Sequence, residues 1–303
     1  MKDIATIIFR LTISCLLAGL VMGTAFVLTN KAKLHNAEER EHKVMLGLLG
    51  YSEAKPAPES LQFHPIHRYI VTSGEISSLG YLVPVQGANG EGSVFVEIGL
   101  DGAFVAQQPV RLSAGQAAEA SGREAAISAA VGPEKKLRYA DQTIVVTENG
   151  KRRAYLLPGE FPGFKTFINV ILALDPKFTV LGLEIMEHEE DPGLGGEIVQ
   201  GYFKNQFQGK TFEVLKKLGV VKTPLPEEYR RVLEPGKNGE AIGPEEIASV
   251  QAQYQDKDIY ALTGATISSR AVTNGVKAIA NKFAYRLAIL DKVLADQHIA
   301  VAF

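Results

Sequence analysis

An unbroken apolar run opens the chain. From Leu11 to Asn30 the sequence LTISCLLAGLVMGTAFVLTN contains no charged residue. A helix of about 20 such residues spans the hydrocarbon core of a bilayer. The run is longer than the apolar core of a typical signal peptide, and no convincing small-x-small cleavage motif follows it. We therefore predict that residues 1–30 form a transmembrane anchor that is not cleaved and crosses the membrane once.

Residues 31–60 differ from the apolar run in composition. The sequence up to Gly50 is rich in charge and predicts a juxtamembrane helix, and the Pro-rich stretch YSEAKPAPES predicts a linker. From residue 61 onward apolar and polar residues alternate in several places, and β-branched residues are frequent. The pattern therefore predicts one folded domain over residues 61–303.

Alternation within this domain predicts antiparallel hairpins. One hairpin turns near Gly74, and Asn149-Gly150 is a dipeptide favoured in the type I′ turn of another. Between residues 164 and 187 the tripeptide DPK separates two apolar runs, which predicts a third. Because strands and helices do not alternate regularly, we expect an α+β fold with a mostly antiparallel sheet packed by helices.

Two stretches interrupt the strands. A Gly-rich break, QGANGEG, follows the first hairpin, and residues 107–138 are rich in Ala, Ser, Gln and Gly with few large apolar groups. We expect residues 107–138 to form one modest helix with loops, peripheral to the core.

A long amphipathic helix is predicted to begin near Ile267. Ser268 or Ser269 is placed to cap its N-terminus. Its apolar positions recur mostly at intervals of three and four, as expected for one buried helix face: Val272, Val276, Ile279, Phe283, Leu287 and Leu290.

Composition narrows the function classes. The 32 basic and 34 acidic residues give a net charge of -2, so no basic excess indicates a nucleic-acid partner. Cys15 is the only cysteine and lies in the apolar run, so cysteines provide no disulfide framework, zinc site or iron–sulfur ligand set. Redox chemistry in this chain would require a cofactor held by other groups.

The start of the C-terminal helix concentrates hydroxyl groups. Small residues there allow a ligand to approach the backbone, and a helix N-terminus attracts phosphate. The same residues would also serve as an ordinary helix cap, and composition alone leaves both interpretations open. The residues of this motif, TGATISS, that we single out are Thr263, Gly264, Ala265, Thr266, Ser268 and Ser269.

A second motif, HEEDPGLGGE, covers residues 188–197. Only one histidine, His188, stands beside its acidic residues. In an extended chain, Glu189 and Glu190 would face opposite sides. We therefore interpret the acidic part as a loop and predict no metal site. The segment PGLGG supplies flexible backbone, which would either pack against a flat ligand or turn a corner. The sequence contains no nucleotide P-loop or dinucleotide-binding fingerprint at a strand-to-helix junction, and it offers no serine triad.

Together these motifs resemble the FMN-binding domain family, found in the G subunit of the Rnf electron-transport complex and the C subunit of the sodium-translocating NADH:quinone reductase. TGATISSRAVTNGV is similar to the family's flavinylation motif, and HEEDPGLGGEIVQGYFKNQFQGK is similar to its second hallmark. The sequence AVT after TGATISS is closer to the Rnf G subunit. The resemblance covers about the first 85 residues and residues 160–285, and residues 87–158 look like an insertion.

The resemblance implies a covalent cofactor. In the family, the threonine that corresponds to Thr266 carries FMN through a phosphoester, which a flavin transferase installs from FAD with loss of AMP. It also places Glu190, Gly193, Leu194 and Gly195 near the flavin ring. Two positions depart from the family pattern: Tyr260 stands where an Asp is usual, and Asp191 replaces a Thr.

The resemblance further implies the role and location of the chain. It would relay electrons through FMN between other membrane subunits of an ion-translocating complex. It would be an electron-transfer subunit and not an enzyme on its own, with no catalytic acid–base residues. It would sit in the cytoplasmic (inner) membrane, with its soluble domain on the extracytoplasmic, periplasmic side.

Two alternatives stay open at this point. The domain would also suit an FMN-binding subunit or regulator of another membrane redox system, such as the quinone reductase C-subunit type. The other alternative is a non-redox extracytoplasmic binding module, in which TGAT is only a helix cap. Bound flavin discriminates between the redox and non-redox interpretations.

Overall fold

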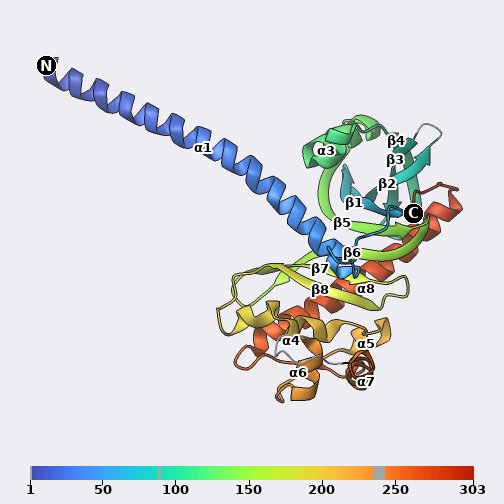
Figure 1. Ribbon diagram of the computed structural model, residues 1–303. Helices are drawn as coiled ribbons and strands as arrows, with labels where there is room; N and C mark the ends of the chain where they lie inside the picture. Colours follow the sequence, from blue (N-terminus) through green and yellow to red (C-terminus); the bar gives the residue numbers. More distant parts are fainter. Residues whose placement is uncertain (1, 88–89, 235–242) are drawn as a thin grey trace. The chain divides into compact units, whose positions relative to one another are not determined.

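The computed structural model of the chain describes residues 2–87, 90–234 and 243–303 (Figure 1). Residues 88–89 of the predicted Gly-rich break lie outside this description. The chain divides into two compact units, residues 1–47 and residues 48–303. Helix α1 (Lys2–Leu48) forms the first unit and runs without interruption past residue 30.

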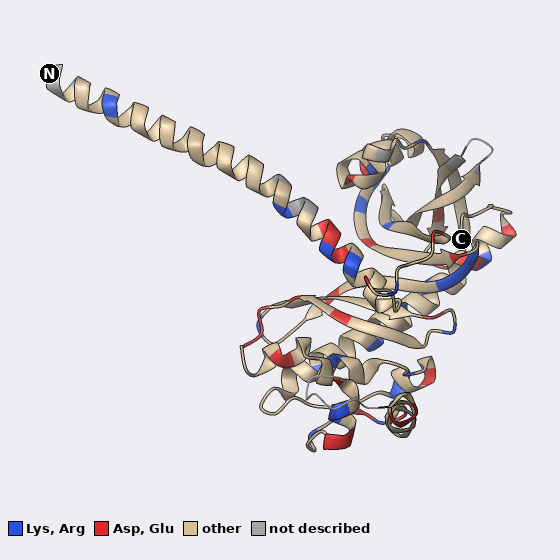
Figure 2. Cartoon of the chain, in the orientation of Figure 1, with Lys and Arg blue, Asp and Glu red and all other residues tan. Residues whose placement is uncertain are grey.

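Helix α1 contains the predicted anchor. Its segment Thr6–Asn30 is long and apolar enough to cross a membrane. Figure 2 shows the uncharged stretch of this helix, with charged residues toward both of its ends. The helix stops at Leu48, and Gly50 then adopts a positive φ of 85° that favours glycine.

The described part of the second unit contains an eight-stranded antiparallel sheet with the order β4-β3-β2-β1-β5-β6-β7-β8. The expected α+β class with an antiparallel sheet is confirmed. The strands are β1 (Leu61–Ser73), β2 (Ile76–Gly87), β3 (Gly90–Gly99), β4 (Phe104–Val110), β5 (Lys136–Glu148), β6 (Lys151–Pro162), β7 (Phe167–Leu174) and β8 (Val180–Glu187).

The predicted hairpins form where local turn chemistry demands them. Asn149 and Gly150 join β5 to β6 with φ of 52° and 72°, the pair of positive values that a type I′ turn requires. In the β7–β8 turn, one carboxylate oxygen of Asp175 accepts from the backbone N–H groups of Lys177 and Thr179, each at 2.8 Å. Gly74 lies between β1 and β2.

Helices pack on the sheet, and Figure 1 shows α4 to α7 gathered beside β7 and β8, with α8 running along the unit. A short parallel pair, β9 (Val220–Val221) and β10 (Ile259–Tyr260), lies among them. The helices are α2 (Ala114–Ala118), α3 (Ala120–Val131), α4 (Gly201–Lys204), α5 (Phe212–Lys217), α6 (Glu227–Leu233), α7 (Pro244–Tyr254) and α8 (Thr266–Asp296), with 3-10 turns η1 (Gly195–Val199) and η2 (Asn205–Phe207).

The main core lies between the sheet and α8. The predicted amphipathic pattern of α8 is confirmed, because its apolar residues at intervals of three and four are buried against the strands, with Ile279 partly buried. Each large apolar side chain buried in this way contributes about 1.5–3 kcal/mol. The helix therefore holds its N-terminal motif at a defined place beside the sheet.

A second core lies beneath α3. Tyr69, Phe95 and Ile127 pack together there, and Ile127 is 0% exposed. The expectation of one helix peripheral to the core is wrong for residues 107–138, which contain two helices, α2 and α3, between the end of β4 and the start of β5. Ala-rich α3 buries Ile127 against residues of the strands, so a sequence of mostly small residues still contributes to a core.

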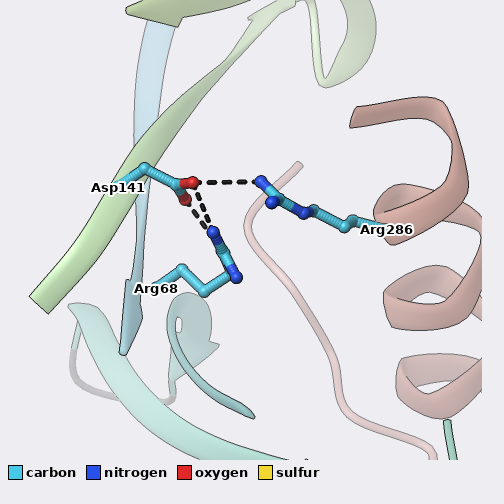
Figure 3. Close-up of polar contacts among 3 residues, drawn as sticks. All are labelled: Arg68, Asp141 and Arg286. Atoms are coloured by element: carbon cyan, nitrogen blue, oxygen red, sulfur yellow. Dashed lines mark hydrogen bonds and ion pairs between the residues drawn. The ribbon is translucent and has the colours of Figure 1, made fainter. Parts of the chain in front are cut away.

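The segment predicted to be an insertion, residues 87–158, supplies β3, β4 and β5 to the same sheet, and β5 pairs directly with β1. An ion-pair cluster fixes this region to α8 (Figure 3). Asp141 accepts from Arg68 Nε at 2.8 Å and from Arg286 Nη1 at 3.0 Å, so it joins β5, β1 and α8.

The contact of α8 with β6 requires a glycine. A Cβ at Gly275 would overlap the ring of Phe161. We expect Gly275→Ala to lower the free energy of unfolding by about 1–3 kcal/mol, because the ring must leave its position. Urea denaturation followed by near-UV circular dichroism measures the loss. The matched control is Gly47→Ala, a helical glycine with nothing within 4 Å, and an equal effect of both changes would contradict the packing argument.

Burial of His67 makes stability depend on pH. The side chain is 6% exposed, its Nδ1 has no hydrogen-bond partner, and burial with nearby Arg123 lowers its pKa from 6.5 to about 4. Between these values the unfolded chain binds more protons than the folded one, so stability falls as pH falls through this window. We expect His67→Gln to remove about 3 kcal/mol of that pH dependence, measured by urea denaturation at pH 7 and pH 4. Parallel pH profiles of the two proteins would refute this account.

Candidate functional site

The two sequence motifs meet at the N-terminus of α8. The carboxylate of Glu190 accepts a hydrogen bond from Ser268 Oγ and another from the backbone N–H of Phe164 at 2.6 Å. Glu190 is 4% exposed and Ser268 3% exposed. The backbone N–H of Glu190 in turn donates to His188 Nδ1 at 3.1 Å. Residues 78 positions apart in the sequence therefore form one buried contact.

Glycines make this close approach possible. A Cβ at Gly195 would lie 2.6 Å from Ser268 Oγ and 2.7 Å from Glu190 Oε2. Gly264 has a φ of +75°, and a Cβ there would lie 3.0 Å from Leu194 Cδ2. Side chains at either position would separate the PGLGG segment from the TGAT segment.

The hydroxyl groups of the motif fall into two sets. Ser268 Oγ is bound to Glu190, and Ser269 Oγ accepts from Leu262 N–H at 3.0 Å and donates to the Ala265 carbonyl at 2.9 Å. In the described part of the chain, the side chains of Thr263 and Thr266 make no hydrogen bond. Two of the four hydroxyls thus build the loop, and two are available to a ligand.

The prediction that Ser268 or Ser269 caps α8 is wrong. The N-cap residue is Ala265, and no side chain provides a cap hydrogen bond. Ser268 and Ser269 lie inside the first turn, where their hydroxyls face Glu190 and the preceding loop instead of the free amides. The first-turn N–H groups of this 31-residue helix and the positive end of its dipole therefore stay available to an anion beside half-buried Thr266.

A cavity of about 390 Å³ opens next to the motif. Of the predicted site residues, Gly193, Leu194 and Thr263 line it, whereas Glu190 and Gly195 are buried in the contact with Ser268. The remaining lining consists of Glu197, Tyr202, Gln206, Pro224, Leu225, Arg230, Tyr260, Ala261 and Leu262.

Several of these lining residues were missed by the sequence interpretation. Tyr202 OH donates to Glu197 at 2.9 Å, and burial together with this bond raises the pKa of Tyr202 to about 12. The guanidinium carbon of Arg230 lies 4.6 Å from the centre of the Tyr202 ring. Nothing in the local pattern distinguishes these residues from ordinary helix residues, because only the fold brings α4 and α6 to the same cavity.

Tyr260, which stands where the resemblance expects Asp, lines the cavity from β10. Its backbone N–H donates to Gln206 Oε1 at 2.8 Å, and its carbonyl accepts from Gln206 Nε2 at 3.2 Å. The nearest aspartate, Asp258, accepts the Gly219 N–H at 2.7 Å and so connects β10 to β9. The buried amide of Gln206 therefore fixes the strand that leads into the motif.

Lys210 binds the segment that leads into the same strand. The residue is 1% exposed, and its ammonium group donates to the carbonyls of Tyr254, Gln255 and Lys257, at 3.3, 3.0 and 2.6 Å. Tyr254 and Gln255 are the last residue and the C-cap of α7, so the cation satisfies orphan acceptors at a helix C-terminus. Burial lowers the pKa of Lys210 to about 8.

A known family matches the segment that contains the candidate site. Residues 163–281 match the FMN-binding domain family, and the matched segment contains both motifs and the cavity. The resemblance drawn from the two motifs is therefore confirmed for this segment.

Two curated relatives are similar to part of the chain. The chain is 30% identical over 143 residues to the G subunit of the proton-translocating ferredoxin:NAD(+) oxidoreductase complex of Clostridium ljungdahlii, covering 47% of this chain and 57% of that protein. It is 27% identical over 165 residues to the G subunit of the ion-translocating oxidoreductase complex of Vibrio parahaemolyticus, covering 54% and 64% respectively. The chain thus spans less than two thirds of the length of these relatives.

A solved structure similar to part of the chain is the crystal structure of Shewanella oneidensis NqrC. The two share 20% sequence identity with a TM-score of 0.33, over 48% of this chain and 57% of that one.

The hydrogen bond between Ser268 and Glu190 should contribute to the free energy of unfolding. Ser268→Ala leaves a buried carboxylate without one donor, and hydrogen bonds to charged groups contribute about 1.5–3 kcal/mol. We expect that loss in the free energy of unfolding, measured by urea denaturation. Thr263→Ala is the matched control, because its hydroxyl is exposed and unbonded among the described residues, and it should change stability by less than about 0.5 kcal/mol. Equal losses in the two variants would count against the buried bond.

Proposed function

We propose that this chain is a membrane-anchored flavoprotein subunit of an Rnf-type ion-translocating electron transport complex. It relays electrons through FMN attached by a phosphoester to Thr266. The observation that carries the proposal is the meeting of the two motifs at the uncapped N-terminus of α8, where Ser268 and Ser269 are occupied and Thr266 is not.

The residues present fit an FMN group. A phosphate on Thr266 would lie at the positive end of a long helix with free amides, which stabilises its charge. The neighbouring cavity of about 390 Å³ has the size of a small-molecule site, with Tyr202 and Tyr260 in its walls for a planar ring. FMN bound there supplies reversible uptake and release of electrons.

Attachment requires chemistry that a separate flavin transferase supplies. The Thr266 hydroxyl loses its proton and its oxygen forms a bond to the FMN phosphorus of FAD. The phosphoanhydride bond breaks and AMP leaves. This chain's own contribution is to present the hydroxyl: the contact of Glu190 with Ser268 fixes the first turn of α8, and Gly264 keeps side-chain bulk away.

The remaining parts of the proposal concern location and partners. The apolar segment Thr6–Asn30 anchors the chain in the cytoplasmic membrane, with the domain on the extracytoplasmic side. Other membrane subunits of the complex exchange electrons with the bound FMN. The names of the relatives, which are subunits of ion-translocating oxidoreductase complexes, support this assignment.

Covalent flavin is the direct test. The full-length chain, produced together with a flavin transferase, should give a fluorescent band after denaturing electrophoresis. Thr266→Ala should abolish the fluorescence, because no other hydroxyl of the motif is both unbonded and at the start of α8. Thr263→Ala is the matched control and should keep the band.

Two results would contradict the proposal. A dark wild-type band, with the transferase active on a control substrate, would favour a non-redox binding module. A fluorescent Thr266→Ala band would mean that another residue carries the flavin.

A further inference from the structure

The cavity beside the motif has an uneven distribution of charge. Among the described residues of its lining, Glu197 is the anion and Arg230 the cation. Glu197 comes from η1, next to the PGLGG segment, whereas Arg230 comes from α6, on a different part of the chain. The two charged groups therefore reach the cavity from separate elements.

Arg230 is held in a defined position without being neutralised. Its guanidinium lies over the face of the Tyr202 ring, with 4.6 Å from its carbon to the ring centre. Within the described ranges, no carboxylate forms an ion pair with Arg230. Stacking of this kind orients the planar guanidinium and leaves its N–H donors and charge available to a ligand.

Glu197 is placed differently. Its carboxylate accepts the hydroxyl of Tyr202 at 2.9 Å, so the ring that supports Arg230 also binds the anion. One tyrosine thus contacts both charged groups of the cavity lining. Any ring bound in this cavity experiences both charges, and each acts on its electron affinity with opposite sign.

We propose that Arg230 is the residue that raises the electron affinity of the bound flavin. Reduction adds negative charge to the isoalloxazine ring, and a neighbouring cation stabilises that charge. The inference rests on the proposed function, because it requires FMN in this cavity. It goes further by assigning control of the reduction potential to one side chain that lies outside both sequence motifs.

The test is a redox titration of the loaded protein. Full-length wild type, Arg230→Gln and Arg230→Lys are produced with a flavin transferase, and the bound FMN is titrated with an external reductant in a spectroelectrochemical cell. Arg230→Gln should shift the midpoint potential to more negative values. At the wild-type midpoint, its ratio of reduced to oxidised FMN should fall about fivefold, a modest change because Arg230 is solvent-exposed. Arg230→Lys should retain most of the wild-type potential because it keeps the charge.

Three further variants complete the test. Arg231→Gln removes the same charge from the next residue of α6, which does not line the cavity, and should leave the midpoint unchanged. Glu197→Gln should shift the midpoint in the opposite direction, to more positive values. Arg230→Met replaces Arg230→Gln if the glutamine variant carries no flavin.

The outcomes distinguish a failure of the proposed function from a failure of the role assigned to Arg230. Wild type without covalent FMN overturns the proposed function, and the inference with it. Loaded Arg230→Gln with the wild-type midpoint overturns the inference alone, as does an equal shift in Arg231→Gln.

Discussion

A buried carboxylate holds the site together. Glu190 accepts the hydroxyl of Ser268 and the backbone N–H groups of Phe164 and Lys165, so α8, the 188–197 loop and the turn between β6 and β7 converge on one group. A charge removed from water is tolerated only when its acceptor sites are filled. The contact therefore admits little displacement, and the position of Thr266, two residues before Ser268, follows from it.

A second layer of buried polar groups supports this contact. Gln206 and Lys210 lie near the end of the second hallmark segment, and both direct their side chains to backbone groups in or near β10. Their side-chain hydrogen bonds order the backbone in a region with little regular secondary structure, where β10 has only two residues. The approach to the TGAT segment is thus ordered by side chains, which explains how a loop can present a hydroxyl at a defined place.

The sequence predicted those features that depend on neighbouring residues. The apolar run of the anchor, the Asn149-Gly150 turn and the periodic face of α8 need only local pattern, and all three have the expected local structure. The capping role assigned to Ser268 and Ser269 was wrong because their partners are set by tertiary contacts, above all with a glutamate 78 residues away.

The residues that line the cavity were likewise not predictable from local sequence. Tyr202 and Arg230 belong to separate short helices, and neither has a local signature of ligand contact. Their pairing results from the packing of α4 against α6, which no periodicity encodes. The two motifs predict from sequence where a ligand would bind, whereas the residues that line the cavity beside them could be identified only from the fold.

Site-resolved mass spectrometry tests the central claim most directly. Trypsin cleaves after Lys257 and Arg270, so residues 258–270 form one peptide that contains every hydroxyl of the motif. After production with a flavin transferase, we predict that this peptide gains the mass of FMN less one water, and that fragmentation assigns the gain to Thr266. An unmodified peptide from protein made with an active transferase, or a gain on any other residue, would contradict the account.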